Sequence, residues 1–329
     1  MTDLALSTRP RVGLGCMGMS GFYGPPDDEQ STRILLDAFG VGYRHFDTAD
    51  FYGDGRNELL LGKFLRELGS RRHEVLLATK VGIRRTGTGP LSAVIDSSGQ
   101  YVRTACERSL ERLGIERIDL LYVHRRSPDH PIDETVEAMQ QLRAEGKIGG
   151  LGLSEVSVGT LRAACAAGPI AAVQSEYSLW SRDVERGLLR ACEELGVVFV
   201  AYSPLGRGYL TAELDIPNAV ASKVDFRSHL PRFEAQNVAA NGRLLDGLRA
   251  VAERLGYSPS QVALAWLLTR TSMLHVIPGT RNAQHLRANF AAVECQLSDA
   301  AQKELELLFA IENISGERYP PNLMATVNR

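Results

Sequence analysis

Short apolar runs alternate along the chain with longer segments in which apolar residues recur at helical spacing. Each run has four to seven residues, and most are rich in Val, Leu, Ile or Tyr, which is typical of buried parallel strands. The eight runs occupy residues 12–15, 43–48, 75–80, 118–124, 149–154, 171–177, 197–203 and 273–279. Strands that alternate with helices in this way pair in parallel and are joined by right-handed crossovers.

The segments between these runs carry helix start and stop signals. Segment 25–40 opens on acidic residues and ends at a glycine, and segment 131–147 is acidic at its start and basic at its end. Ser258 precedes Pro259 in segment 257–270, as an N-cap precedes the first turn. Further helical patterns fill residues 57–68, 99–113, 157–167, 183–194, 238–255, 282–293 and 298–311. We therefore predict an α/β fold, a single (β/α)8 TIM barrel domain over residues 1–329 with an extra C-terminal helix and long mouth loops.

A doubly wound, Rossmann-type sheet is the alternative fold. Gly13, Gly15 and Gly18 match the letters of the dinucleotide fingerprint G-x-G-x-x-G. That fingerprint is meaningful only where it opens a helix, and here the sequence MSGFYGPP, typical of a loop, follows it. The barrel is favoured, and no linker or low-complexity segment divides the chain.

Charge and composition narrow the class of protein. The chain has 37 basic and 39 acidic residues, so its net charge of −2 gives no field that would attract nucleic acid. It has no secretory signal pattern and no run of roughly 18 apolar residues that could span a membrane. The five cysteines form no C-x-x-C pair, which is typical of reduced thiols. These features predict a cytoplasmic globular protein.

Four reactive residues are expected at one patch of the barrel mouth, because barrel active sites lie at the C-terminal ends of the strands. Lys80 and His124 end the third and fourth runs, Asp47 lies at the end of the second run just before Thr48, and Tyr52 follows Asp47 by five residues. Lys80 is one of only five lysines in the chain. Each residue alone could be a helix cap or a packing residue, but together they predict a reactive site.

The chemistry of this set points to proton transfer. It lacks further His, Cys or acidic ligands at metal spacing, so no metal site is predicted. Lys80 beside Asp47 would stay charged and lower the pKa of Tyr52, which suits general acid–base catalysis, and His124 could orient a carbonyl. A proton donor aimed at a carbonyl needs a hydride source, which implies a nicotinamide cofactor. A lyase that uses Lys80 as a Schiff-base amine is the alternative, and it would not need the cofactor motifs.

The chain resembles the aldo-keto reductase family, in the branch near potassium-channel β-subunits and pyridoxal-reductase-like enzymes. The segments YRHFDTADFYG, ATKVG, LYVHR and AYSPLGRGYL occur in the family's order, and the match runs from GLGCMGMSGFYG to IPGTRNAQHLRANF. The resemblance implies that Asp47, Tyr52, Lys80 and His124 form the catalytic tetrad. In that mechanism hydride passes from the nicotinamide to the carbonyl carbon while Tyr52 protonates the oxygen.

The resemblance also implies an NADP site at the carboxyl ends of the later strands. The implied contacts are Ser154 and Gln174 to the carboxamide, Tyr202 stacked on the nicotinamide, Ser203, Leu205 and Arg207 at the pyrophosphate, and Gly279, Thr280, Arg281, Gln284 and Asn289 at the adenosine and 2′-phosphate. A cation and a hydroxyl beside the ribose favour NADP over NAD. Two positions depart from the family pattern: Ala288 stands where many relatives have Glu, and Glu155 where they often have Asn. The first predicts a missing adenine or ribose contact, and Glu155 receives no role.

Aromatic residues in the mouth loops predict a pocket for an apolar or aromatic carbonyl substrate. These residues are Phe22, Tyr23, Phe51 and Trp180. Cys16 is expected to lie near the nicotinamide as a lining residue rather than as a nucleophile. The long loops at 81–98 and 204–237 are expected to be lids or binding elements.

The predicted function is the NADPH-dependent reduction of a ketone or aldehyde to an alcohol. The abundance of arginine and alanine suggests a GC-rich genome, which favours a tailoring ketoreductase of bacterial secondary metabolism. The alternative is an NADP-binding regulatory protein, similar to a channel β-subunit, with slow turnover. The expected partner is a small carbonyl compound rather than nucleic acid or membrane, and the sequence leaves a homo-oligomer open.

Overall fold

The computed structural model describes residue 6 and residues 9–87, 93–222 and 224–328. Eight strands form one sheet in the order β1-β2-β3-β6-β7-β8-β9-β10, and all seven neighbouring pairs are parallel. The strands are β1 (Leu14–Gly15), β2 (His45–Asp47), β3 (Leu76–Val81), β6 (Ile118–Val123), β7 (Ile148–Ser154), β8 (Ile170–Glu176), β9 (Val198–Tyr202) and β10 (Leu274–Val276). Each of the eight predicted runs overlaps one of these strands, with ends that differ by three residues or fewer.

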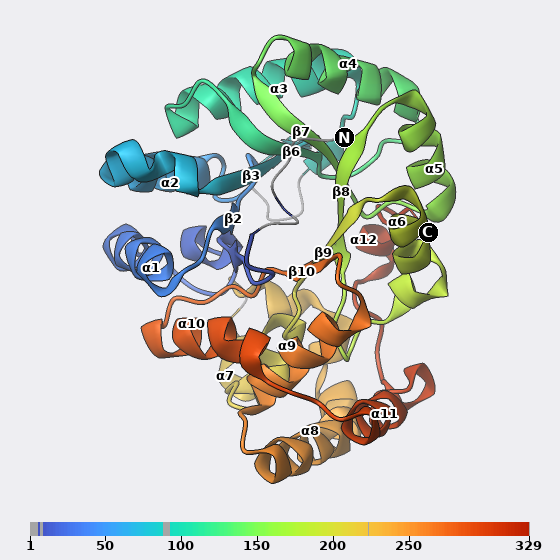
Figure 1. Ribbon diagram of the computed structural model, residues 1–329. Helices are drawn as coiled ribbons and strands as arrows, with labels where there is room; N and C mark the ends of the chain where they lie inside the picture. The colour runs from blue at the N-terminus through green and yellow to red at the C-terminus, as the bar shows by residue number, and fades with distance from the viewer. Residues whose placement is uncertain (1–5, 7–8, 88–92, 223, 329) are drawn as a thin grey trace.

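The sheet closes on itself between its first and last strands. Val12 and Val276 form a parallel bridge, in which Gly13 N donates to Val276 O at 2.8 Å and Val276 N donates to Arg11 O at 2.9 Å. Helices surround the strands on all sides (Figure 1). The predicted (β/α)8 barrel is therefore confirmed.

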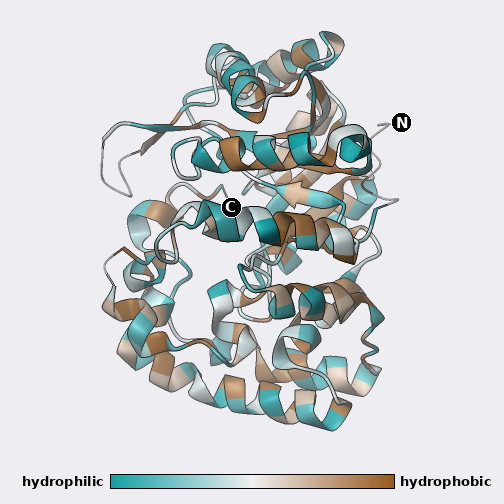
Figure 2. Cartoon of the chain, turned by 90° about the vertical axis from the view of Figure 1, so that its left-hand side faces the viewer, coloured by the Kyte–Doolittle hydropathy of each residue, from teal (hydrophilic) through white to brown (hydrophobic). Residues whose placement is uncertain are grey.

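The longer helices lie outside the strands, and each buries residues against the barrel or against a neighbouring helix. They are α1 (Asp28–Val41), α2 (Arg56–Leu68), α3 (Gly99–Leu113), α4 (Ile132–Ala144), α5 (Val158–Ala167), α6 (Leu188–Leu195), α8 (Ala235–Leu255), α9 (Pro259–Arg270), α10 (Ala283–Phe290) and α11 (Asp299–Leu308). Hydrophilic and hydrophobic residues alternate along them, as expected for helices with one buried side (Figure 2). Ser258 and Gln261 form the capping box that starts α9, at the predicted position. Among the described residues, none of the helices has the length and apolar character needed to cross a bilayer.

The glycines that resemble a dinucleotide fingerprint serve the packing of the barrel seam. A Cβ on Gly13 would lie 2.9 Å from the His45 side chain, and a Cβ on Gly15 would lie 2.7 Å from the carbonyl oxygen of Ile277. The segment that follows is a short 3-10 turn, Met17–Ser20, rather than the helix that a phosphate-binding turn would open. The doubly wound alternative is therefore wrong, because these glycines permit close approach of β1 to its neighbours.

The long loops and the end of the chain contain elements that the sequence pattern did not predict. Loop 81–98 carries an antiparallel hairpin of β4 (Ile83–Arg85) and β5 (Ala93–Ile95), and its residues 88–92 lie outside the described residues. Loop 204–237 contains α7 (Ile216–Ala221), and its residue 223 also lies outside them. Helix α12 (Pro321–Met324) follows α11 near the C-terminus. These elements have three to six residues, too few to show a periodic pattern.

Candidate active site

The four predicted catalytic residues lie together at the carboxyl ends of β2, β3 and β6. The Lys80 ammonium forms an ion pair with the Asp47 carboxylate and donates to the Tyr52 hydroxyl oxygen at 3.3 Å. Gln174 Nε2 donates to the other carboxylate oxygen of Asp47 at 2.8 Å. The His124 ring meets the Tyr52 ring edge-on, with 5.8 Å between the ring centroids. A phenol, an ammonium, a carboxylate and an imidazole thus form one buried group.

Burial and charge set the proton states of this group. Burial raises the pKa of Tyr52, and the Lys80 ammonium opposes this shift without cancelling it. The net shift is opposite to the one expected from the sequence, because burial outweighs the cation. Burial acts to lower the pKa of Lys80, but Asp47 and Tyr52 outweigh it, so the pKa of Lys80 lies above its ordinary value. A buried, protonated lysine is not a nucleophile, which argues against the Schiff-base lyase.

His124 is a neutral hydrogen-bonding group. Burial, together with the charges of Arg125 and Lys80, holds the pKa of His124 well below its ordinary value. A neutral imidazole keeps one N–H donor, which can bond to an uncharged oxygen acceptor. Among the described residues, no three His, Cys, Asp or Glu side chains are arranged to hold a metal ion.

A cleft with a volume of about 450 Å³ opens beside Asp47 and Tyr52. Most residues that the family resemblance assigns to the cofactor line it. They are Gln174, Tyr202, Ser203, Leu205, Arg207, Gly279, Thr280, Gln284 and Asn289. Ala288, the position expected to depart from the family pattern, also lines the cleft and presents only a methyl group to it.

Three residues with expected places in the cofactor site lie elsewhere. Arg281 lines a separate hollow between α1 and α10, and its Nη1 donates to the carbonyl oxygen of Pro25 at 2.8 Å. Ser154 lines a smaller, adjacent cavity instead of the cleft. Cys16 is fully buried and lines neither, while its neighbour Met17 lines both. The expected lining role of Cys16 is wrong because the chain turns its thiol into the core.

The smaller cavity, of about 200 Å³, shares Tyr52 with the cleft and also contains His124. Phe22 and Phe51 line it, as predicted for a substrate pocket, and the β4–β5 hairpin contributes Ile83, Ala93 and Ile95. Tyr23 instead lines the larger cleft.

Trp180 lines neither cavity, although the sequence analysis placed it at the substrate pocket. Two backbone hydrogen bonds between Ser178 and Ser181, each of 3.1 Å, close a tight turn after β8. Trp180 is 1% exposed and stacks on Tyr209 with 3.9 Å between the ring centroids. Its assignment to the pocket is therefore wrong, because this turn directs the indole into the core.

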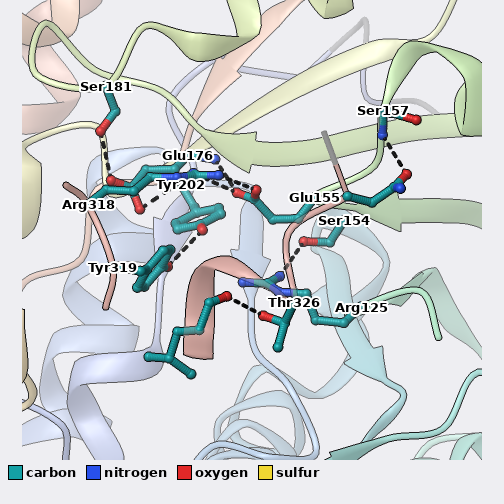
Figure 3. Close-up of polar contacts among 12 residues, drawn as sticks. Arg125, Ser154, Glu155, Ser157, Glu176, Ser181, Tyr202, Arg318, Tyr319 and Thr326 are labelled. Atoms are coloured by element: carbon teal, nitrogen blue, oxygen red, sulfur yellow. Dashed lines mark hydrogen bonds and ion pairs between the residues drawn. The ribbon is translucent and has the colours of Figure 1, made fainter. Parts of the chain in front are cut away.

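A buried network of arginines and glutamates attaches the C-terminal segment, residues 314–328, to the barrel (Figure 3). Arg318 donates to both carboxylate oxygens of Glu155, at 3.1 and 2.7 Å, and Arg207 donates to Glu176 at 2.7 Å. We call these four residues the arginine–glutamate cluster. Burial acts to raise the pKa of Glu155, but Arg318 and Arg125 outweigh it and lower the pKa to about 2. Glu155, which had no role on sequence grounds, therefore holds the C-terminal segment.

The C-terminal segment completes the wall of the smaller cavity with Tyr319, Leu323 and Thr326. The hydroxyls of Tyr319 and Tyr202 lie 3.0 Å apart and face one another in Figure 3. Further along the segment, Asn328 Oδ1 accepts a hydrogen bond of 2.9 Å from Ser157 N at the start of α5. The segment thus joins the substrate cavity to the ends of β7 and β9.

Sequence reasoning missed two groups of cavity residues. The first is the C-terminal segment, whose sequence has no periodic pattern and no strand end to mark it. The second is Arg125, which lines the cavity beside His124. The sequence could have indicated the place of Arg125, because this residue directly follows the predicted catalytic histidine in LYVHR.

The chain is similar to known proteins over most of its length. The family model described as "Aldo/keto reductase family" matches residues 11–308. The chain is 39% identical over 318 residues to "Aldo-keto reductase yakc [NADP(+)]" of Schizosaccharomyces pombe, covering 95% of this chain and 92% of that protein. It is 40% identical over 310 residues to "Probable aldo-keto reductase 1" of Glycine max, covering 94% and 88% of the two chains.

Solved structures show the same architecture. The glycerol dehydrogenase AKR11B4 from Gluconobacter oxydans is similar with a TM-score of 0.83 and 29% identity, covering 94% of each chain. The holo form of the aldo-keto reductase AKR11C1 from Bacillus halodurans is similar with a TM-score of 0.74 and 28% identity, also covering 94% of each. With a family model over nearly its whole length and relatives near 40% identity, this chain belongs to the aldo/keto reductase family of oxidoreductases.

Proposed function

We propose that the protein catalyses the NADPH-dependent reduction of an aldehyde or ketone to an alcohol. The observation that carries this proposal is the position of Tyr52, which lines both the larger cleft and the smaller cavity. A protonated phenol therefore lies where a cofactor and a substrate bound in the two spaces would meet. The relative from Schizosaccharomyces pombe, whose name includes NADP(+), supports this choice of cofactor.

The residues of the cleft fit an NADP cofactor. Gln174 offers an amide, and Tyr202 offers an aromatic ring on which a flat heterocycle can stack. The remaining polar and small groups suit phosphate and adenosine, and we assign Ser203, Leu205 and Arg207 to the pyrophosphate and Gly279, Thr280, Gln284 and Asn289 to the adenosine half. When bound, NADPH supplies the hydride that the carbonyl carbon accepts.

The protein's own residues supply the proton and stabilise the charge that develops on the carbonyl oxygen. Tyr52 is kept protonated by burial and donates its proton to that oxygen. The Lys80 ammonium, 3.3 Å from the hydroxyl, stabilises the phenolate that remains. Asp47 holds Lys80 in place, and the neutral imidazole of His124 donates a hydrogen bond to the same carbonyl oxygen.

The first test measures the loss of NADPH absorbance with a panel of uncharged aldehydes and ketones. Wild-type protein is expected to turn over at least part of the panel. Tyr52→Phe removes the transferable proton and should lower kcat by about 10²- to 10⁴-fold, with NADPH affinity unchanged. Tyr101→Phe is the matched control, since Tyr101 lies on α3 and lines neither space, and it should retain full activity.

Full activity of Tyr52→Phe would refute the proposed mechanism. Tight NADPH binding by the wild-type protein without turnover of any carbonyl would favour the regulatory alternative instead. A place in secondary metabolism stays a prediction from composition.

A further inference from the structure

The smaller cavity contains a buried cation that the proposed reaction does not use. Arg125 directly follows His124 at the end of β6 and lines the cavity with Phe22, Phe51 and Leu323. A guanidinium stays charged at any pH at which proteins fold. A permanent positive charge therefore faces this space. Arg207 also lines it but is paired with Glu176 at 2.7 Å, and most of the remaining wall is apolar.

The hydrogen bonding of Arg125 is incomplete. Its Nη1 donates to the carbonyl oxygen of His124 at 2.7 Å and to Ser154 Oγ at 3.3 Å. Among the described residues, its Nε and Nη2 groups have no acceptor, and no ion pair includes it. Arginine carries five N–H donors in a planar fork, so the edge that remains can still bind a planar acceptor.

The charge of Glu155 acts on Arg125, but the ion pairs of the nearby carboxylates are made with other arginines. In the arginine–glutamate cluster, the Glu155 carboxylate accepts two hydrogen bonds from Arg318 and one from Glu176 N, and Glu176 pairs with Arg207 at 2.7 Å. With Arg125, three buried or half-buried arginines therefore face two carboxylates. Positive charge exceeds negative charge among these five residues, so a bound anion would stabilise this region of the protein.

We propose that Arg125 binds a carboxylate carried by the substrate, so that the preferred substrates are carbonyl compounds with an apolar body and a carboxylate group. This inference rests on the proposed function and names its substrate class. A carboxylate matches the guanidinium fork with two parallel hydrogen bonds, and a pocket of low polarity strengthens such a pair. Because Arg125 directly follows His124, a substrate that binds both residues would have its carbonyl oxygen and its carboxylate close together.

The apolar walls restrict the rest of the substrate. Phe22, Phe51 and Phe226 surround the cavity with aromatic rings, and the β4–β5 hairpin adds Ile83 and Ile95. A volume of about 200 Å³ suits a body of the size of one aromatic ring with its substituents. Substituted benzaldehydes are therefore suitable probes.

The experiment compares the three isomers of carboxybenzaldehyde with the three isomers of nitrobenzaldehyde. A nitro group has nearly the shape of a carboxylate but no net charge, so each pair isolates the charge. Arg125→Gln should lower kcat/KM for the best carboxybenzaldehyde by about 10- to 100-fold, mainly through KM. The same variant should change kcat/KM for the matching nitrobenzaldehyde by less than about threefold. Arg125→Lys should keep part of the preference, since lysine is a point charge without the planar fork.

Arg126→Gln is the matched control, because Arg126 is the next residue and lines neither cavity. It should behave as wild type with both series. Equal losses for carboxy and nitro substrates in Arg125→Gln would overturn the proposal and assign Arg125 to the support of Ser154. Unchanged kinetics with both series would also overturn it.

A binding measurement separates failure of this inference from failure of the proposed function. Calorimetry of the NADP⁺-loaded wild-type protein should show that hydroxymethylbenzoate binds at least about tenfold more tightly than nitrobenzyl alcohol. Arg125→Gln, and independently Arg125→Lys if the first variant does not fold, should reduce that difference. If no aldehyde of either series is reduced, the proposed function fails, and this calorimetric difference still decides whether Arg125 binds a carboxylate.

Discussion

Two buried groups of charged residues lie beside the candidate substrate cavity, and they differ in the sequence separation of the residues that they pair. Asp47 and Lys80 come from the neighbouring strands β2 and β3, so barrel formation alone brings them together. Arg318 and Glu155 are separated by 163 positions and meet only when the C-terminal segment folds back over the barrel. The first pair holds the proposed proton donor, and the second holds a wall of the cavity.

This difference predicts how the protein should respond when each group is removed by substitution. The Asp47–Lys80 pair is part of the strands, so its loss affects the whole barrel together with the chemistry. The arginine–glutamate cluster fastens one segment outside the strands, and such a segment can open by itself while the barrel stays folded. Activity and stability should therefore respond differently to changes in the two groups.

The largest effect is expected from Lys80→Met. The variant leaves Asp47 buried without its cation, so the free energy of unfolding should fall by about 3–5 kcal/mol. It also removes the ammonium beside Tyr52, and kcat should fall by at least about 10²-fold. Denaturant unfolding and NADPH oxidation measure the two losses.

A double variant provides the control for Lys80. Asp47→Asn combined with Lys80→Met removes both charges and should recover much of the lost stability without recovering activity. Recovery of activity by the double variant would show that neither charge takes part in the proton transfer.

A smaller and more local effect is expected from Arg318→Met. Glu155 then loses both hydrogen bonds from Arg318, and detachment of the C-terminal segment should become easier by about 3 kcal/mol. Faster amide hydrogen exchange in residues 314–328 would detect this opening, and KM for the substrate should rise more than kcat falls.

Arg254→Met is the control for this variant. It removes an exposed ion pair with Glu304 and should change the free energy of unfolding by less than about 1 kcal/mol. Equal exchange throughout the barrel in Arg318→Met would contradict the local role.

Acid should weaken the cluster through Glu155. The pKa of this carboxyl is lowered from 4.5 to about 2, so the folded protein binds fewer protons there than the unfolded chain. The stabilisation is complete above pH 4.5 and is lost as the pH falls toward 2. Glu155→Gln should therefore unfold with a weaker pH dependence in this interval, by an amount on the order of a few kcal/mol. Parallel stability curves for the two proteins would rule out this source of acid sensitivity.

The smallest effect is expected at the far end of the C-terminal segment. Asn328→Ala removes the hydrogen bonds that its Oδ1 accepts from Ser157 N and the Thr160 hydroxyl. The loss should be about 1 kcal/mol or less, with kinetics unchanged because Asn328 lines neither cavity. A change in KM as large as that of Arg318→Met would show that the whole segment acts as one unit.

The two groups also differ in how well the sequence predicts them. Asp47, Lys80 and His124 were predictable because strand ends converge at one edge of a barrel, and the hydrophobic pattern locates those ends. The direction of the Tyr52 pKa shift could not be predicted from the sequence, since it depends on how deeply Tyr52 is buried.

Glu155 and Arg318 could not be paired from the sequence because no local rule connects positions so far apart. The pairing requires the path of the C-terminal segment, which has no periodic pattern. The prediction for Trp180 was wrong for a related reason, since a turn of four residues decides whether the indole faces the cavity or the core. Arg281 likewise lies outside the expected cofactor cleft, because its side chain donates a hydrogen bond to the carbonyl oxygen of Pro25.

The route of the C-terminal segment has a consequence for biosynthesis. Every barrel strand precedes residues 314–328 along the chain, and a ribosome delivers the strands first. A nascent chain that has released all eight strands still lacks the Tyr319, Leu323 and Thr326 wall of the smaller cavity. The group of Asp47, Tyr52, Lys80 and His124 can therefore assemble during translation, whereas the smaller cavity can close only after this segment has been made.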